Sequence, residues 1–157
     1  MNPEEVFDYI ERHIAEQDEV ELLLLKGHLV LEQAINARLF MHMSSEKQLI
    51  DMNLMFGKKV DLLVALEGRR PIESVDVITH LRVINKIRNK LAHHLDFESH
   101  YTELEKWAKS VLGGTPKALD ESEALKVVVR NAFVFLAAIL SADTMLNEIE
   151  KKYISSE

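Results

Sequence analysis

The sequence predicts an all-α protein, an antiparallel helical bundle of about four long helices with one or two short ones. Of the 157 residues, only five are glycine and three are proline, while 47% are apolar. This composition favours helices and leaves too few turn residues for a many-stranded β fold. Apolar residues also recur at helical spacing, and the connections between the periodic segments are short. We therefore expect one helical domain over residues 1–157.

Two helices are expected in the N-terminal part of the chain. Asn2 and Pro3 supply a cap and a first-position proline for a helix of about residues 3–17. Asp18 can then cap a second helix of about residues 20–43. Since each residue adds roughly 1.5 Å, this helix is long enough to cross a small domain, and we expect it to be central.

The segment over residues 48–66 predicts two short helices. Ser45 and Gln48 have the spacing of a capping box at its start. Apolar residues follow at helical spacing on both sides of Gly57, so we expect the two helices to meet at that glycine. Gly68 then ends the segment.

Three further helices are expected in the second half of the chain. Apolar residues over 72–95 repeat at helical spacing, and a helix over about 98–112 ends at Gly113. The last helix covers about 120–153 and contains the longest apolar stretch, 127–140. That stretch is short for a bilayer span and is interrupted by polar residues, so a buried core helix explains it and no membrane contact is expected.

Cysteine content and charge exclude several classes of function. The chain has no cysteine, which excludes a disulfide framework, a thiolate metal site and a cysteine nucleophile. Acidic residues stand near the N-terminus where a secretory signal would carry Lys or Arg, and we expect a cytoplasmic protein. The net charge is −7, so any contact with RNA has to be local.

No cofactor and no metal ion are expected. The histidine and acidic side chains over 93–100 lack the spacing of a zinc motif, because adjacent histidines point in different directions. Gly113 and Gly114 have no strand or lysine context and do not form a phosphate-binding loop. The chain also lacks a helix-turn-helix signature with a basic recognition helix, so DNA binding is not expected.

Residue types suited to catalysis concentrate over residues 82–96, which read RVINKIRNKLAHHLD. Arg88, Asn89 and His93 match the Arg-polar-x3-His signature of the HEPN superfamily, an all-α family that includes ribonuclease toxins and RNA-processing enzymes. The wider context, with LLLKGHLVLEQAIN on the central helix, resembles the mannitol operon repressor-like branch. The resemblance covers roughly residues 20–100. It implies a homodimer that cleaves RNA without a metal through Arg88, Asn89 and His93.

Helical geometry gives Arg88 a structural interpretation beside the catalytic one. At about 100° per residue, Arg88 falls within the apolar stripe of its helix, so we expect it to be buried or at an interface. Glu32 lies among apolar residues on the central helix, where an acid requires a cation. We therefore expect an ion pair between Arg88 and Glu32, which is compatible with a role in catalysis. His28, one turn before Glu32, is interpreted as a hydrogen-bonding histidine at the edge of the core.

The neighbouring face of the same helix is polar. Asn85, Asn89 and His93 share this face, and Asn85 and His94 are candidate supporting residues. His93 suits general acid or base catalysis because the pKa of histidine is near neutral. Arg88 and His93 lie about 140° apart on a straight helix. Two copies around a twofold axis are therefore expected to bring both residue types to one phosphate.

Two classes of function remain open at this point. The first is a metal-independent endoribonuclease of toxin or stress-response type, with an RNA substrate and an antitoxin partner. The second is a non-catalytic regulatory or protein-interaction module resembling the mannitol operon repressor family, in which Arg88 is structural. The intact motif favours the first class, whereas the acidic net charge and the expected burial of Arg88 favour the second.

Overall fold

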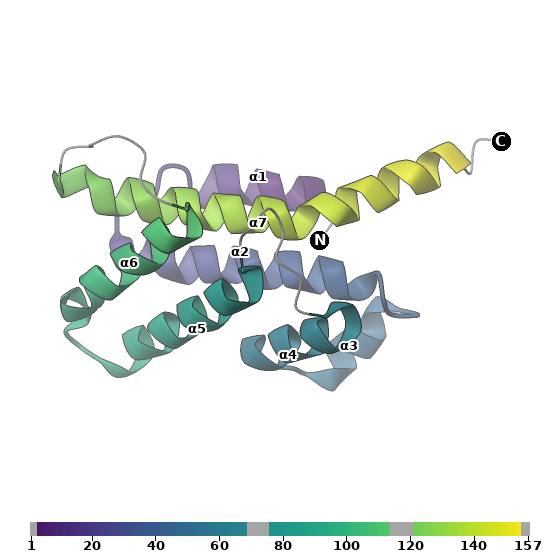
Figure 1. The fold of residues 1–157 in the computed structure, drawn as a ribbon, viewed down its shortest axis with the longest axis horizontal. Coiled ribbons are helices and arrows are strands. Elements are labelled where there is room, and N and C mark those ends of the chain that lie inside the picture. Colours follow the sequence, from purple (N-terminus) through teal and green to yellow (C-terminus); the bar gives the residue numbers. More distant parts are fainter. Residues whose placement is uncertain (1–2, 69–75, 114–120, 155–157) are drawn as a thin grey trace.

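A computed structural model describes residues 3–68, 76–113 and 121–154 of the chain. All regular secondary structure in these residues is helical, which confirms the all-α bundle (Figure 1). The elements are α1 Pro3–His13, α2 Val20–Phe40, α3 Glu46–Met52, α4 Phe56–Glu67, α5 Val77–His93, the short 3-10 helix η1 Phe97–His100, α6 Tyr101–Val111 and α7 Glu121–Ile154.

The centre of the bundle is the contact between α2 and α7. Gly27 on α2 lies against Phe133 on α7, and a Cβ atom added to Gly27 would stand 2.5 Å from that ring. Toward the C-terminal ends of both helices, Arg38 of α2 donates to the carbonyl oxygen of Leu140 of α7 at 3.4 Å. These two contacts show that α2 and α7 run in the same direction. Helices adjacent in sequence, such as α1 and α2, run antiparallel as expected (Figure 1).

The apolar stretch of the last helix forms part of the core, as its sequence predicts. Phe133 and Leu136 are fully buried and face α2 and α6 with the other buried side chains of the stretch. Within the described residues, the window Leu125–Ala142 is long and apolar enough to cross a membrane by length and composition alone, and half of it is buried in the bundle.

The start of α2 differs from the prediction. The residue at the helix cap is Glu19 and not Asp18, and its side chain makes no capping hydrogen bond. The preceding helix α1 ends at His13, earlier than expected, and a turn connects the two. Burial of Val20 on the core fixes the first turn of α2 without help from a cap.

The junction between the two short helices also differs from the prediction. Helices α3 and α4 meet over residues 53–55, where Asn53 adopts a left-handed conformation with φ of 47°. Gly57 lies instead in the first turn of α4. Of the expected capping box, Ser45 stands at the cap without a side-chain bond, and the Gln48 side chain accepts a hydrogen bond from the Ser44 amide. Asparagine tolerates this left-handed conformation, so it ends α3 where a glycine was expected.

Helix α5, which carries Arg88, Asn89 and His93, has Asp76 as its N-cap, a residue that the sequence analysis did not identify as a cap. Asp76 accepts hydrogen bonds from the amide and hydroxyl of Thr79, at 3.1 and 2.7 Å. The helix ends at His93, so Leu95 lies beyond it and is fully exposed rather than part of the apolar stripe. Residues 72–75, where this helix was expected to begin, and the predicted cap Asn2 lie outside the described residues.

Helix α4 is anchored on α2 by a buried ion pair. Arg38, whose side chain is 9% exposed, donates from Nε to Glu67 at 2.8 Å. His42 approaches the other oxygen of the same carboxylate at 2.8 Å. Because a buried carboxylate is stable only when its oxygens are paired, this cluster holds the end of α4 beside α2.

Candidate functional site

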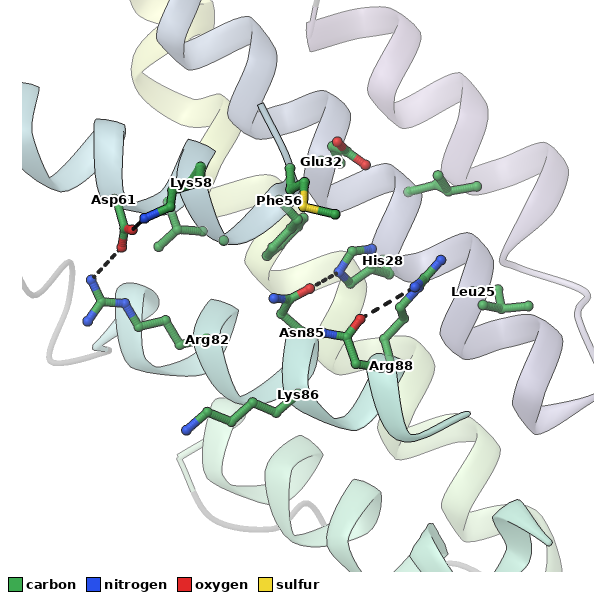
Figure 2. A pocket seen from close by; sticks show the side chains of 15 residues that line it. Leu25, His28, Glu32, Phe56, Lys58, Asp61, Arg82, Asn85, Lys86 and Arg88 are labelled. Atoms are coloured by element: carbon green, nitrogen blue, oxygen red, sulfur yellow. Dashed lines mark hydrogen bonds and ion pairs between the residues drawn. The ribbon is translucent and has the colours of Figure 1, made fainter. Parts of the chain in front are cut away.

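A cleft of about 710 Å³ opens between α2, α4 and α5 (Figure 2). Its apolar wall comes from Leu25 and Leu29 on α2, together with Met55 and Phe56 at the start of α4. Its polar side comes mainly from α5 and carries the side chains of Arg82, Asn85, Lys86, Arg88 and Asn89. A volume of this size is within the range of pockets that bind small molecules or parts of larger ligands.

His28 lies in this cleft and is fixed by a partner from α5. Its Nε2 lies 3.1 Å from Asn85 Oδ1, and its ring centroid lies 4.1 Å from that of Phe56. Figure 2 shows the His28 and Asn85 side chains facing each other. The amide oxygen can only accept, so Nε2 carries the proton and Nδ1 of the neutral ring is an acceptor.

The environment of His28 favours the neutral ring. Burial lowers the pKa of His28 below its usual value. The hydrogen bond that His28 donates to Asn85 raises the pKa in part, the charge of Arg88 lowers it further, and the charge of Glu32 raises it. The balance leaves His28 neutral at pH 7 and able to accept a proton.

The expected ion pair between Glu32 and Arg88 is wrong. Glu32 pairs with Lys59 of α4 instead, with Oε1 2.7 Å from Nζ. The side chains of this pair are 24% and 12% exposed. Because α4 packs against the side of α2 that carries Glu32, Lys59 provides the cation that this acid requires.

Arg88 is half-buried and is left without a carboxylate partner among the described residues. Its hydrogen bond is to a neutral group, from Nη1 to Asn89 Oδ1 at 3.4 Å. Of the two other α5 cations that line the cleft, Arg82 pairs with Asp61 of α4 at 3.2 Å, and Lys86 has no acidic partner among the described residues. The part of the cleft near Arg88 therefore carries positive charge that no acidic side chain in the described ranges neutralises.

The structure brings together four of the six predicted site residues. Arg88, Asn89, Asn85 and Glu32 all line the cleft. His93 is the last residue of α5, is exposed and does not line the cleft. The adjacent His94 lies after the helix, where its ring packs edge-on against His100 with centroids 5.0 Å apart.

His28 lines the cleft, whereas the sequence analysis interpreted it as a histidine at the edge of the core and not as a site residue. The prediction that it forms a hydrogen bond is confirmed, but it lines the cleft with Arg88. Its spacing of one turn from Glu32 put both residues on one face of α2, and this was the available signal. The described part of the chain holds no group of three or more histidine and acidic side chains that could bind a metal ion.

Comparison with protein-family models, with curated proteins and with solved structures finds no match to this chain. The HEPN resemblance therefore rests on the sequence motif and stays a prediction. Around one cleft, the geometry offers a neutral histidine, amide groups and an arginine that has no acidic partner in the part of the chain that the structure describes. This combination can bind an anion and can transfer a proton beside it.

Proposed function

We propose that this protein is a cytoplasmic, metal-independent endoribonuclease of HEPN type that acts as a homodimer in a toxin or stress response. The observation that carries the proposal is Arg88, a half-buried guanidinium with no carboxylate partner in the described chain. The structural interpretation of Arg88 required Glu32, and Glu32 is already paired with Lys59. Arg88 is therefore available for an anionic ligand.

A phosphodiester fits the free arginine better than a neutral ligand does. A partly desolvated guanidinium gains most from a charged acceptor that it can bind through two parallel hydrogen bonds. Lys86 on the same helix also lines the cleft and has no acidic partner in the described residues. Two such cations give an acidic protein a local site for the RNA backbone.

The proposed reaction assigns one role to each motif residue. Arg88 binds the phosphate and stabilises the charge that develops on it, and Asn89 orients the guanidinium through its side-chain oxygen. His93 transfers a proton as general acid or base. His93 stands at the exposed end of α5, outside the cleft, so a second copy brings it to the phosphate of its partner.

The test is cleavage of mixed RNAs by purified protein in EDTA, with the product ends examined for cyclic phosphate. His93→Ala should reduce the rate by roughly 10² to 10⁴, because general acid–base catalysis contributes about that factor. It should leave the thermal midpoint unchanged, since His93 is exposed. His13→Ala, which removes an exposed histidine from the end of α1, is the matched control and should cleave normally. Wild-type protein that does not cleave in EDTA rejects the proposal.

The dimer is tested by mixing two inactive variants. If the site combines Arg88 of one copy with His93 of the other, then Arg88→Ala and His93→Ala together restore part of the cleavage, because a mixed dimer contains one intact set. Sedimentation of the wild type establishes whether two copies associate. A monomer at tens of micromolar, or no recovery on mixing, removes the composite site.

A second candidate function is a non-catalytic regulatory or protein-interaction module resembling the mannitol operon repressor family. The observation that favours it is the apolar wall of the cleft, where Leu29 and Met55 are 47% and 80% exposed. Exposed apolar groups of this kind occur at protein interaction sites, such as one for an antitoxin or a regulatory protein. A wild-type protein that binds RNA or a partner without cleavage in EDTA would favour this function.

A further inference from the structure

Cleavage of RNA without a metal needs two proton transfers, and each copy of the motif supplies one histidine. The 2′-hydroxyl must lose a proton to attack, and the departing 5′ oxygen must gain one. His93 lies at the exposed end of α5 and does not line the cleft. Among the described residues, His28 is the histidine that does line it, together with Arg88.

We propose that His28 is the general base of this reaction, taking the proton from the 2′-hydroxyl of an RNA chain held in the cleft by Arg88. The assignment rests on the proposed ribonuclease function and adds a residue of α2 that lies outside the motif. It leaves His93 as the general acid.

The position of the His28 ring is fixed for this role. Asn85 Oδ1 accepts from the Nε2 proton at 3.1 Å, and Phe56 packs against the ring with a centroid separation of 4.1 Å. Asn85 therefore selects the tautomer in which Nδ1 accepts a proton, as a second group commonly does for a histidine base. The residue is 6% exposed, so its ring is held in one orientation and remains at the cleft surface.

The charges around His28 favour a base over an acid. From α5, Arg88 repels a proton on the ring, and from α2, Glu32 attracts one. Lys59 of α4 binds the Glu32 carboxylate at 2.7 Å and neutralises part of that attraction. Of the remaining cleft charges, Asp61 of α4 pairs with Lys58 of α4 and with Arg82 of α5. Lys86 of α5 lines the cleft without an acidic partner among the described residues, and its positive charge also disfavours a proton on the ring. With burial as the largest cause, the pKa of His28 lies below its usual value.

The step balances in atoms and charge. Nδ1 of His28 takes the 2′-hydroxyl proton, and the 2′ oxygen forms a bond to the adjacent phosphorus. The bond from phosphorus to the 5′ oxygen breaks, and that oxygen takes a proton from His93. The products are a 2′,3′-cyclic phosphate and a 5′-hydroxyl, after which His28 releases its proton to water and His93 regains one. Arg88 remains bound to the phosphate throughout.

The first experiment compares buried His28 with partly buried His80, which differ in their access to the cleft. His28→Gln keeps a side chain that can donate to Asn85, and it should reduce cleavage by roughly 10² to 10⁴. His80→Gln is the matched control, because burial also lowers the pKa of His80 but this residue does not line the cleft. It should cleave at nearly the wild-type rate. Circular dichroism and thermal midpoints establish that both variants fold.

The second experiment tests proton transfer through the pH profile. Asn85→Asp places a negatively charged carboxylate beside Nε2 of His28, which raises the pKa of the ring. The acidic limb of the kcat/KM profile should therefore move to higher pH. A purely structural role for His28 would leave that limb in place. This variant also decides the question if His28→Gln does not fold.

The outcomes separate the two proposals. Wild-type protein without EDTA-resistant cleavage overturns both. Cleavage that is lost in His93→Ala but retained in His28→Gln overturns the role of His28 alone, as does an Asn85→Asp profile with an unmoved acidic limb. Loss of activity in His28→Gln, retention in His80→Gln and a shifted limb in Asn85→Asp support it.

Discussion

At the scale of single residues, Lys59 is the cation that determines how Glu32 is stabilised. Replacing Lys59 with Ala leaves the carboxylate three-quarters buried without its partner at 2.7 Å. Loss of one member of a fully buried pair costs about 3–5 kcal/mol, and the residual exposure of Glu32 reduces this to about 1–2 kcal/mol. Urea denaturation of Lys59→Ala at neutral pH should show this decrease in the free energy of unfolding.

The adjacent lysine provides the control. Lys58 pairs with Asp61 at 3.4 Å, and its side chain is 72% exposed. Removal of an exposed pair changes stability by less than about 1 kcal/mol. If Lys58→Ala and Lys59→Ala unfold at the same urea concentration, then Glu32 does not depend on Lys59 and our account of this pair is wrong.

The same pair shows where sequence reasoning reaches its limit for single residues. Helical spacing located Glu32 among apolar residues and so predicted that it needs a cation. Spacing cannot show which helix packs over that face, and the cation came from α4 and not from α5. His28 was interpreted as a core-edge residue for the same reason, since its place in the cleft depends on Asn85, 57 positions away in the chain.

At the scale of helices, the close approach of α2 and α7 depends on Gly27. A Cβ atom at this position would lie 2.5–2.6 Å from three atoms of the Phe133 ring, closer than packed atoms allow. Since Phe133 is fully buried, its ring cannot move without displacing α7. Gly27→Ala should therefore destabilise the protein by about 1–3 kcal/mol, the usual cost of overpacking. Thermal or urea unfolding measures this change.

A second helical glycine separates this steric effect from helix propensity. At Gly57, a Cβ atom would meet only Asn85 Nδ2 at 3.6 Å, which is an ordinary contact. Alanine in a helix is favoured over glycine by about 0.5–1 kcal/mol, so Gly57→Ala should be neutral or stabilising. A stability loss at Gly57 equal to that at Gly27 would contradict the close-approach argument.

Helices with strong apolar periodicity were predicted well, and their ends and directions were predicted less well. The central helix and the last helix depend on many regularly spaced apolar residues, so the observed α2 and α7 match the expected segments closely. The ends depend on single residues, such as Asn53 at the end of α3 and Asp76 before α5. The parallel direction of α2 and α7 arises from contacts between distant segments, such as Gly27 with Phe133, which local spacing does not encode.

At the scale of the whole molecule, the cleft exists because three helices meet, each with a different contribution. Helix α2 provides His28, α4 provides much of the apolar wall, and α5 provides Arg88 and its polar neighbours. The sequence identified the α5 residues from one continuous motif. It could not identify the cleft itself, because a cavity is a property of the packed helices and not of any one of them.

The stability of the whole protein should depend on pH through buried His28 and partly buried His80. Burial lowers the pKa of both His28 and His80 below their usual value of 6.5 in the folded state. The unfolded chain therefore binds more protons than the folded chain as the pH falls below about 6.5. The stability is fully present above that pH and decreases as the pH falls toward the folded-state pKa values. Urea denaturation at about pH 7.5 and 5.5 should show less stable protein at the lower pH, while most carboxylates remain ionised.

Variants assign this pH dependence to the two histidines. His28→Gln and His80→Gln each remove a histidine whose surroundings in the folded protein resist protonation, so each should reduce the difference in unfolding free energy between the two pH values. The double variant should reduce it further, because the two rings have different surroundings: Asn85 bonds to His28, whereas the charge of Asp76 acts on His80. The exposed-histidine variant His13→Ala serves as the control and should keep the wild-type difference. If the double variant retains the full difference, then burial of these two histidines is not its cause, and the neutral state of His28 that its role as a base requires loses its support.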